Sequence, residues 1–296
     1  MSHLAKEIAA SELLVTQQNT IYHLNLAPEH IAPTVITVGD PDRVQEVSKY
    51  FDQVTHKAQH REFVTHTGYI GKKHLSVVST GIGPDNIDIV LNELDALVNI
   101  NMHTRTVKEQ HTALSIIRMG TCGALQADIE PGAMVVSSYG IGMDNLLQYY
   151  RYNNTPDELY ILSEFERHAG PGIKNISPYI TEASISPRKH FGSQYVHGIT
   201  VTCPGFYGPQ GRSLRLPLAH PHLVDAFTSF SCQDKRIVNF EMETSAIYGL
   251  GRLLGHKYLS ISTVVANRVN KTVAKNGSIA VENMIKHSLE IIAAIE

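Results

Sequence analysis

Residues 33–51 read Pro-Thr-Val-Ile-Thr-Val-Gly-Asp-Pro-Asp-Arg-Val-Gln-Glu-Val-Ser-Lys-Tyr-Phe, and they set the pattern of the whole chain. The first part, residues 33–40, is an apolar, β-branched run that predicts a buried strand ending in a loop. The second part, residues 43–51, predicts a helix with Asp40 or Asp42 near its start. A strand that leads directly into a helix is the repeating unit of an α/β fold.

The same alternation continues towards the C-terminus. Further strands are predicted over residues 74–79, 112–119, 133–138, 201–203 and 258–266, and helices over 87–99, 243–254 and 281–295. The sequence therefore predicts an α/β fold, a single three-layer α/β/α domain over residues 21–296 with a central mixed, mostly parallel, twisted sheet. Residues 1–20 are predicted to be an N-terminal extension with a short amphipathic helix over 5–15. Residues 146–175, rich in Tyr, Asn and charge, are predicted to leave the core.

Composition narrows the classes of function. The 296 residues are 43% hydrophobic and carry a formal net charge of −3, which predicts a globular protein that does not bind nucleic acid. The three cysteines lack the spacing of a disulfide framework or a zinc site, and the 16 histidines show no metal-ligand spacing, so no metal is predicted. No run approaches the ~20 apolar residues of a membrane helix, and no signal peptide is recognisable. These features predict a cytoplasmic protein without a membrane partner.

Basic residues follow several predicted strands, where the sites of α/β sheets form. Arg118 lies near the end of a strand predicted to be buried, and a buried guanidinium needs an anionic partner. A phosphate dianion is one such partner. The candidate phosphate ligands are Gly39, Arg43, Arg61, Arg118 and Thr121. The alternative is a set of separate salt bridges to Asp40, Glu62 or Glu130.

The loop 204–212, Pro-Gly-Phe-Tyr-Gly-Pro-Gln-Gly-Arg, combines aromatic rings with an amide and a guanidinium. The ring of Phe206 can lie against a flat heterocycle. Gln210 offers a donor and an acceptor and Arg212 offers only donors, which suits the two carbonyls and the N–H of uracil. The alternative is a surface loop whose aromatic side chains anchor it to the core.

Two further motifs bear on ligand type. Asn239-Phe-Glu-Met-Glu243 is predicted to open a helix, where its carboxylates either complement the helix dipole or accept hydrogen bonds from a ribose diol, with Met242 against the sugar. Gly81-Ile-Gly83 lacks the third glycine of a dinucleotide fingerprint, because position 86 is Asn, and it gives little support to a nicotinamide site.

In this order along the chain, these motifs resemble the nucleoside phosphorylase family and, within it, the enzymes that cleave uridine. The matching stretches are Tyr22–Leu24, Gly39–Arg43, His60–Glu62, Ser79–Gly83, Ile117–Thr121, Phe206–Arg212, Asn239–Glu243 and Asn267–Arg268. The resemblance implies a phosphate site at Gly39, Arg43, Arg118 and Thr121, ribose contacts from Met242 and Glu243, and a uracil site at Phe206, Gln210 and Arg212. It also implies that His23, for the ribose 5′-hydroxyl, and Arg61, for phosphate, reach in from a partner subunit.

The activity implied is the reversible phosphorolysis of uridine to uracil and ribose 1-phosphate, with Arg118, Arg212 and Gln210 as the catalytic residues. Phosphate is a co-substrate, no cofactor is implied, and the protein is expected to be a homo-oligomer, at least a dimer. Some relatives hold a monovalent cation between subunits with a Ser where this chain has Asn86. Whether this chain binds such a cation is therefore left open. Asn267 stands where purine-handling relatives carry a proton-donating Asp, which argues against purines. The alternatives are a purine nucleoside phosphorylase or nucleosidase on the same fold, or a non-catalytic nucleoside-binding protein.

Overall fold

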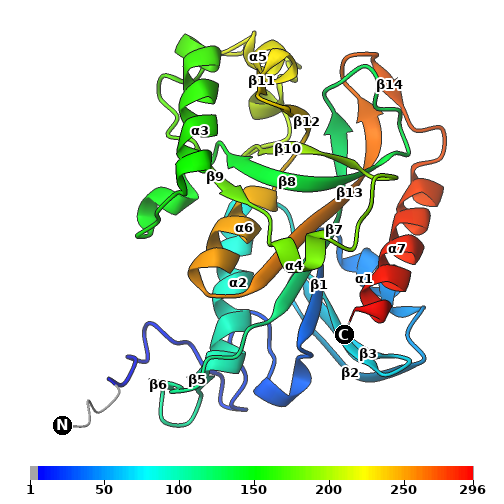
Figure 1. Ribbon diagram of the computed structural model, residues 1–296. Coiled ribbons are helices and arrows are strands. Elements are labelled where there is room, and N and C mark those ends of the chain that lie inside the picture. The colour runs from blue at the N-terminus through cyan, green and yellow to red at the C-terminus, as the bar shows by residue number, and fades with distance from the viewer. Residues whose placement is uncertain (1–5, 296) are drawn as a thin grey trace.

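A computed structural model describes residues 6–295 (Figure 1). The strands are β1 (Thr34–Val38), β2 (Gln53–His60), β3 (Phe63–Ile70), β4 (Lys73–Ser79), β5 (Ile100–Asn101), β6 (Thr106–Val107), β7 (Ser115–Ala124), β8 (Met134–Gly142), β9 (Tyr179–Glu182), β10 (Val196–Thr202), β11 (Ser231–Cys232), β12 (Lys235–Glu241), β13 (Lys257–Asn267) and β14 (Thr272–Val273). All but β5 and β6 belong to one 12-stranded sheet of order β11-β12-β10-β8-β13-β7-β1-β4-β3-β2, with β14 paired to β13 and β9 to β8.

Helices cover both faces of this sheet. They are α1 (Pro41–Ser48), α2 (Pro84–Asn99), α3 (Pro156–Ala169), α4 (Ile185–Arg188), α5 (Leu223–Ser229), α6 (Thr244–Leu253) and α7 (Gly277–Ala294). The short 3₁₀ turns are η1 (Pro28–His30), η2 (Leu146–Tyr149), η3 (Gly170–Ile173) and η4 (Gly208–Gln210). Helices α2 and α6 pack together on one side, and α1 and α7 lie on the other (Figure 1). The predicted α/β fold with a mixed sheet is confirmed.

The centre of the sheet is mixed: strands β4, β1, β7 and β13 pair in parallel, β8 pairs antiparallel with β13, and an antiparallel contact between β12 and β7 closes part of the sheet. Strand β1 pairs in parallel with β4 and β7, and β13 pairs in parallel with β7. Strand β12 pairs with β10 and also, through Asn239 and Phe240, with the end of β7. The strands β7, β13, β8, β10 and β12 therefore form a closed ring, which places the end of β12 beside β7. The sequence pattern did not predict this closure.

Three local predictions differ from the structure. Residues 6–15 form turns rather than a helix, and they are tied to the body by the Ile8 N–H, which donates to the Arg105 carbonyl at 2.8 Å. Strands β2 and β3 were not predicted. Asn239–Glu241 ends strand β12 instead of opening a helix, because its backbone pairs with Thr200–Thr202 of β10, and α6 starts only at Thr244. The domain boundary at residue 20 stays a prediction.

Residues 146–175, whose role the sequence left open, are fixed to the core through a buried ion pair. The side chain of Glu158 in α3 is fully buried and accepts hydrogen bonds from Arg252 of α6 at 2.6 and 2.8 Å. Burial raises the pKa of Glu158, but the hydrogen bonds from Arg252 and from backbone N–H groups outweigh it and leave that pKa lowered. This ion pair ties α3, within the segment, to α6.

Three histidines in the β2–β4 region should make stability depend on pH. Burial lowers the pKa of His56, His66 and His74 below the ordinary value of 6.5, and His56 also stacks on His30 at 3.7 Å. Because the unfolded chain then binds these protons more readily than the folded one, stability should be full above about pH 6.5 and fall as the pH drops below it.

Urea unfolding at pH 7.5, 6.5 and 5.5 measures this effect. Replacing His56 by Asn should reduce the pH dependence, whereas His222→Asn, at a side chain that is 90% exposed, should leave it unchanged. A free energy of unfolding that stays constant over this range would contradict the assignment.

None of the helices formed by residues 6–295 is both long and apolar enough to cross a membrane.

Candidate active site

A cavity of about 780 Å³ lies where β1, β7, β12 and β13 end. Its walls include nine of the residues predicted to bind ligand: Gly39, Arg43, Arg118, Thr121, Phe206, Gln210, Arg212, Met242 and Glu243. Segments that are far apart in the sequence, from Gly39 to Glu243, thus meet in one place. Two predicted site residues, His23 and Arg61, do not line this cavity.

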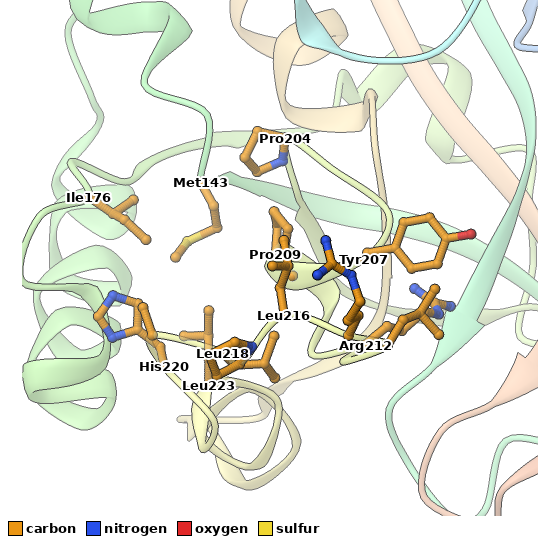
Figure 2. A pocket seen from close by; sticks show the side chains of 15 residues that line it. Met143, Ile176, Pro204, Tyr207, Pro209, Arg212, Leu216, Leu218, His220 and Leu223 are labelled. Carbon is orange, nitrogen blue, oxygen red and sulfur yellow. The ribbon is translucent and has the colours of Figure 1, made fainter.

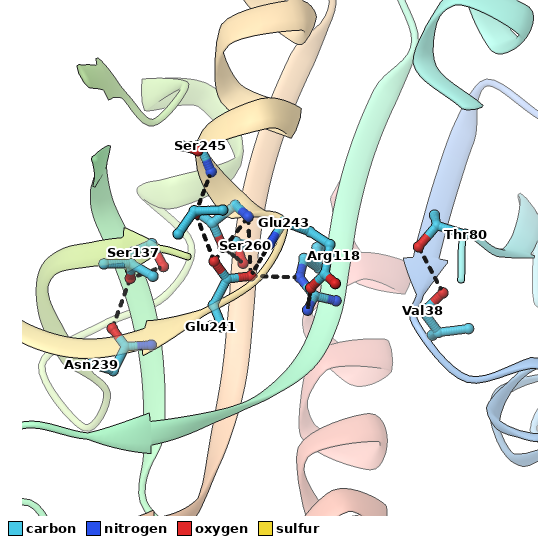
Figure 3. A network of polar contacts seen from close by, with 12 residues as sticks. Val38, Thr80, Arg118, Ser137, Asn239, Glu241, Glu243, Ser245 and Ser260 are labelled. Carbon is cyan, nitrogen blue, oxygen red and sulfur yellow. Dashed lines mark hydrogen bonds and ion pairs between the residues drawn. The ribbon is translucent and has the colours of Figure 1, made fainter. Parts of the chain in front are cut away.

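Arg118 is the charged centre of the cavity wall. Its side chain is 6% exposed, and its Nε donates to Glu241 Oε2 at 3.1 Å while Nη2 donates to Glu243 Oε2 (Figure 3). Burial lowers the pKa of Arg118, but the two carboxylates outweigh burial and leave that pKa raised. The partners are therefore neither Asp40, Glu62 nor Glu130, which the sequence offered as alternatives.

Glu241 holds this arrangement in place. Its carboxylate accepts hydrogen bonds from Thr202 Oγ1 at 2.7 Å and from the backbone N–H groups of Glu243 and Thr244 at 2.9 and 3.0 Å. These bonds satisfy the free N–H groups at the start of α6. The strand end, the helix start and the guanidinium of Arg118 are thus fixed to one carboxylate.

Gly120 leaves the space that the guanidinium of Arg118 occupies. A Cβ atom at this position would lie 2.7 Å from Arg118 Cζ. Gly120→Ala should therefore displace Arg118, and if Arg118 binds phosphate as the sequence predicts, it should lower phosphate-dependent turnover by about one to two orders of magnitude, since a misplacement of about 1 Å can cost 10²-fold. Steady-state kinetics at varied phosphate checks this.

Gly277→Ala is the matched control, because a Cβ at Gly277 would meet no atom within 4 Å. Equal activity in both variants would mean that the position of Arg118 does not matter for turnover.

Arg43 brings a second guanidinium to the cavity without a partner. Its Nε is buried and makes no hydrogen bond, and no ion pair joins Arg43 to another residue of the described chain. Burial and the neighbouring Arg118 both lower the pKa of Arg43. A buried guanidinium and a half-buried one, whose buried Nε has no partner in the described chain, together suit an anionic ligand.

The Gly81-Ile-Gly83 motif donates a backbone hydrogen bond to the carboxylate of Glu243. Gly81 and Gly83 have φ values of +71° and +104°, which side chains rarely adopt. In this conformation the Gly83 N–H donates to Glu243 Oε1 at 2.9 Å. Each oxygen of Glu243 keeps a free lone pair, so the carboxylate can still accept hydrogen bonds from a diol.

Phe206, Gln210 and Arg212 form the opposite end of the cavity. The Arg212 guanidinium lies 3.8 Å from the Phe206 ring centroid, and its Nη1 donates to Gln210 Oε1 at 2.5 Å. The Gln210 amide N–H₂ is left to donate to a ligand. Burial lowers the pKa of Arg212, and the nearby Arg268 lowers it further.

Cys122 also lines the cavity but offers no nucleophile. Burial raises the pKa of its thiol to about 12, so it is neutral at pH 7.

Comparison with known proteins identifies the family. Residues 33–293 match the phosphorylase superfamily. The chain belongs to this superfamily. It is 28% identical to uridine phosphorylase of Thermococcus kodakarensis, over 98% of this chain and 93% of that protein. It is 24% identical to the DeoD-type purine nucleoside phosphorylase of Buchnera aphidicola, over 90% of this chain and 97% of that one. A crystal structure of a Trypanosoma brucei nucleoside phosphorylase, described as showing uridine phosphorylase activity, aligns with a TM-score of 0.87 at 31% identity, over 96% of this chain and all of that one.

In this phosphorylase, Asn267 does not line the cavity. Its amide donates to the carbonyls of Gln126 and Ile129 at 2.8 Å, and its oxygen accepts from the N–H groups of Val269 and Asn270. Its hydrogen bonds are thus taken up by the backbone of two loops. The argument against purines drawn from Asn267 is not supported by this position.

His23 and Arg61 each lie beside Tyr22, outside this cavity. His23 Nδ1 lies 2.6 Å from Glu93 Oε1, and the Arg61 guanidinium lies 5.7 Å from the Tyr22 ring centroid. Their place outside the cavity leaves the predicted contribution from a partner subunit untested.

Several side chains in or beside the cavity were not predicted as site residues. They are Phe240, Val265, Ala266, Arg268 and Val273. Arg212 and Arg268 lie 5.7 and 5.6 Å from the Phe240 ring centroid, and Arg268 donates to the Gln210 carbonyl at 3.1 Å. Arg268 belongs to a motif that the sequence did single out, but its neighbour Asn267 was given the role.

Proposed function

We propose that this phosphorylase catalyses the reversible phosphorolysis of uridine to uracil and ribose 1-phosphate. The observation that carries the proposal is the unpaired, buried Nε of Arg43 beside Arg118, in one cavity with Glu243 and the Gln210–Arg212 pair. These groups suit, in order, a phosphate, a ribose diol and a planar base with acceptors on its edge.

At the phosphate end, the dianion lies against Arg43, Arg118, Thr121 and the backbone at Gly39. It attacks C1′ of the ribose as the N-glycosidic bond lengthens, and its charge stabilises the cation-like sugar. Glu243 holds the 2′- and 3′-hydroxyls and Met242 packs against the ring. The reaction requires no nucleophile from the protein, which agrees with the neutral state of Cys122.

At the base end, the leaving uracil gains negative charge on its carbonyl oxygens. Arg212 and the Gln210 amide N–H₂ donate to these oxygens, and Gln210 Oε1 accepts from the ring N–H. Preorganised donors of this kind are each worth about 3–4 kcal/mol in the transition state. Catalysis rests on Arg118 at one end and on Gln210 and Arg212 at the other.

Uracil release from uridine, with and without phosphate, tests the proposal, with inosine in a parallel assay. We expect phosphate-dependent release of uracil and no cleavage of inosine. Equal release without phosphate would indicate a nucleosidase, cleavage of inosine would indicate a purine phosphorylase, and binding without any cleavage would indicate a nucleoside-binding protein.

We also propose that the active unit is at least a dimer, in which His23 and Arg61 complete the partner's site. Co-expression of Arg61→Met with Arg212→Met chains should restore about a quarter of the native sites, because half of randomly paired dimers are hybrids with one intact site. Each variant alone should be impaired. Co-expressed chains no more active than the mean of the separate variants would contradict shared sites.

A further inference from the structure

A second cavity, of about 660 Å³, adjoins the proposed base site and shares the side chain of Arg212 with it. Figure 2 shows Met143 and Ile176 on one side of this space, Leu218, His220 and Leu223 below, and Tyr207 and Arg212 opposite. Its size and its mostly apolar lining are those of a small-molecule site, which typically measures about 300–1,000 Å³. The mechanism above does not use it.

The charged side chains on its wall are basic. Arg212 and Arg215 line it together with His220, and none of the described residues that line it is acidic. Only Nη1 of Arg212 makes hydrogen bonds within the described chain, to Gln210 Oε1 and to the Phe206 carbonyl. The guanidinium can therefore accept an anionic partner on the side of this cavity.

The mouth of the cavity exposes apolar surface. Leu214 is 81% exposed and Leu216 is 69% exposed, and both side chains line the cavity. A flat ring placed among these leucines and the neighbouring prolines would remove that surface from water. A single carboxylate on the ring would reach the arginines, whereas a second negative charge would have to lie against apolar walls.

We propose that this second cavity binds a flat aromatic monocarboxylate, and that the ligand inhibits the enzyme by pairing with Arg212. The N–H groups of Arg212 that would pair with this carboxylate are those left over by Gln210 and Phe206, and they are the ones proposed to donate to uracil, so the ligand and the base compete for them. Binding to the cavity does not depend on the proposed function, whereas the inhibition rests on it.

Calorimetric titration of the phosphate-free protein with 2-naphthoate tests the binding, with the uncharged 2-naphthamide as the control ligand. We expect 2-naphthoate to bind at least about tenfold more tightly than the amide. Ile176→Trp, which fills the cavity, and Leu216→Glu, which adds a negative charge at an exposed position, should each weaken 2-naphthoate binding by about tenfold or more. Equal binding of acid and amide, or binding unchanged in both variants, would overturn the proposal.

Kinetics then test the inhibition. In the native protein 2-naphthoate should raise the apparent KM for uridine, and Ile176→Trp should remove this effect while it retains turnover. Inhibition that persists in both variants would place the ligand in the base site and overturn the proposal. If uridine is not a substrate at all, the proposed function fails, and the titration still decides whether the cavity binds the acid.

Discussion

Replacing Arg118 by methionine should lower kcat/KM for phosphate by about two to three orders of magnitude, the loss typical for one preorganised charged donor. The variant should also be less stable. Glu241 and Glu243, at 2% and 4% side-chain exposure, would be left buried without their cation, which typically costs about 3–5 kcal/mol. Phosphate saturation kinetics and urea unfolding measure the two effects separately.

Arg236→Met is the control for Arg118. Arg236 forms an ion pair with Asp128 at 2.6 Å, but both side chains are exposed, and such pairs contribute only about 0–1 kcal/mol. An Arg118 variant whose rate still depended on phosphate as the native rate does would remove Arg118 from the phosphate site.

Arg212→Met should lower kcat/KM for uridine by about 10²–10³ through the loss of a donor to the developing uracil anion. The KM for phosphate should stay unchanged, because Arg212 lies at the other end of the cavity. Its effect on stability should be small, since Arg212 is only half-buried and has no ion pair within the described chain. Initial rates at varied uridine and fixed phosphate provide the measurement.

Arg151→Met serves as the companion variant for Arg212, because Arg151 is exposed and lies outside the cavity lining. It should retain native kinetics. Turnover of uridine by Arg212→Met within a few-fold of the native rate would refute the base-site assignment.

Sequence patterns predicted the alternating strands and helices of this fold because their signals are local. The run at 33–51 gives β1 and α1 within a few residues of the predicted bounds, since β-branched runs and a capping Asp40 act over short distances. Strand β2 was not predicted because it is polar and alternates between exposed and partly buried positions.

The sequence predicted most residues that line the candidate site, but it did not predict which side chains pair with one another there. Arg118 was expected to need an anion, yet its pairing with Glu241 and Glu243 depends on the contact between β12 and β7, which no local pattern encodes. Likewise, nothing in the run Asn267-Arg268 tells which side chain faces the loop backbone and which faces Phe240.

The hydrogen bond between Arg118 and Glu243 joins the proposed phosphate site to the proposed ribose site. The same guanidinium that is to hold phosphate occupies a lone pair of the carboxylate that is to hold the sugar. A phosphate that draws on Arg118 frees capacity on Glu243 for a hydroxyl, so the two substrates are coupled heterotropically. By linkage, whatever factor phosphate adds to the affinity for nucleoside, nucleoside must add to the affinity for phosphate. In the proposed mechanism, this one buried ion pair therefore couples the binding of the two substrates.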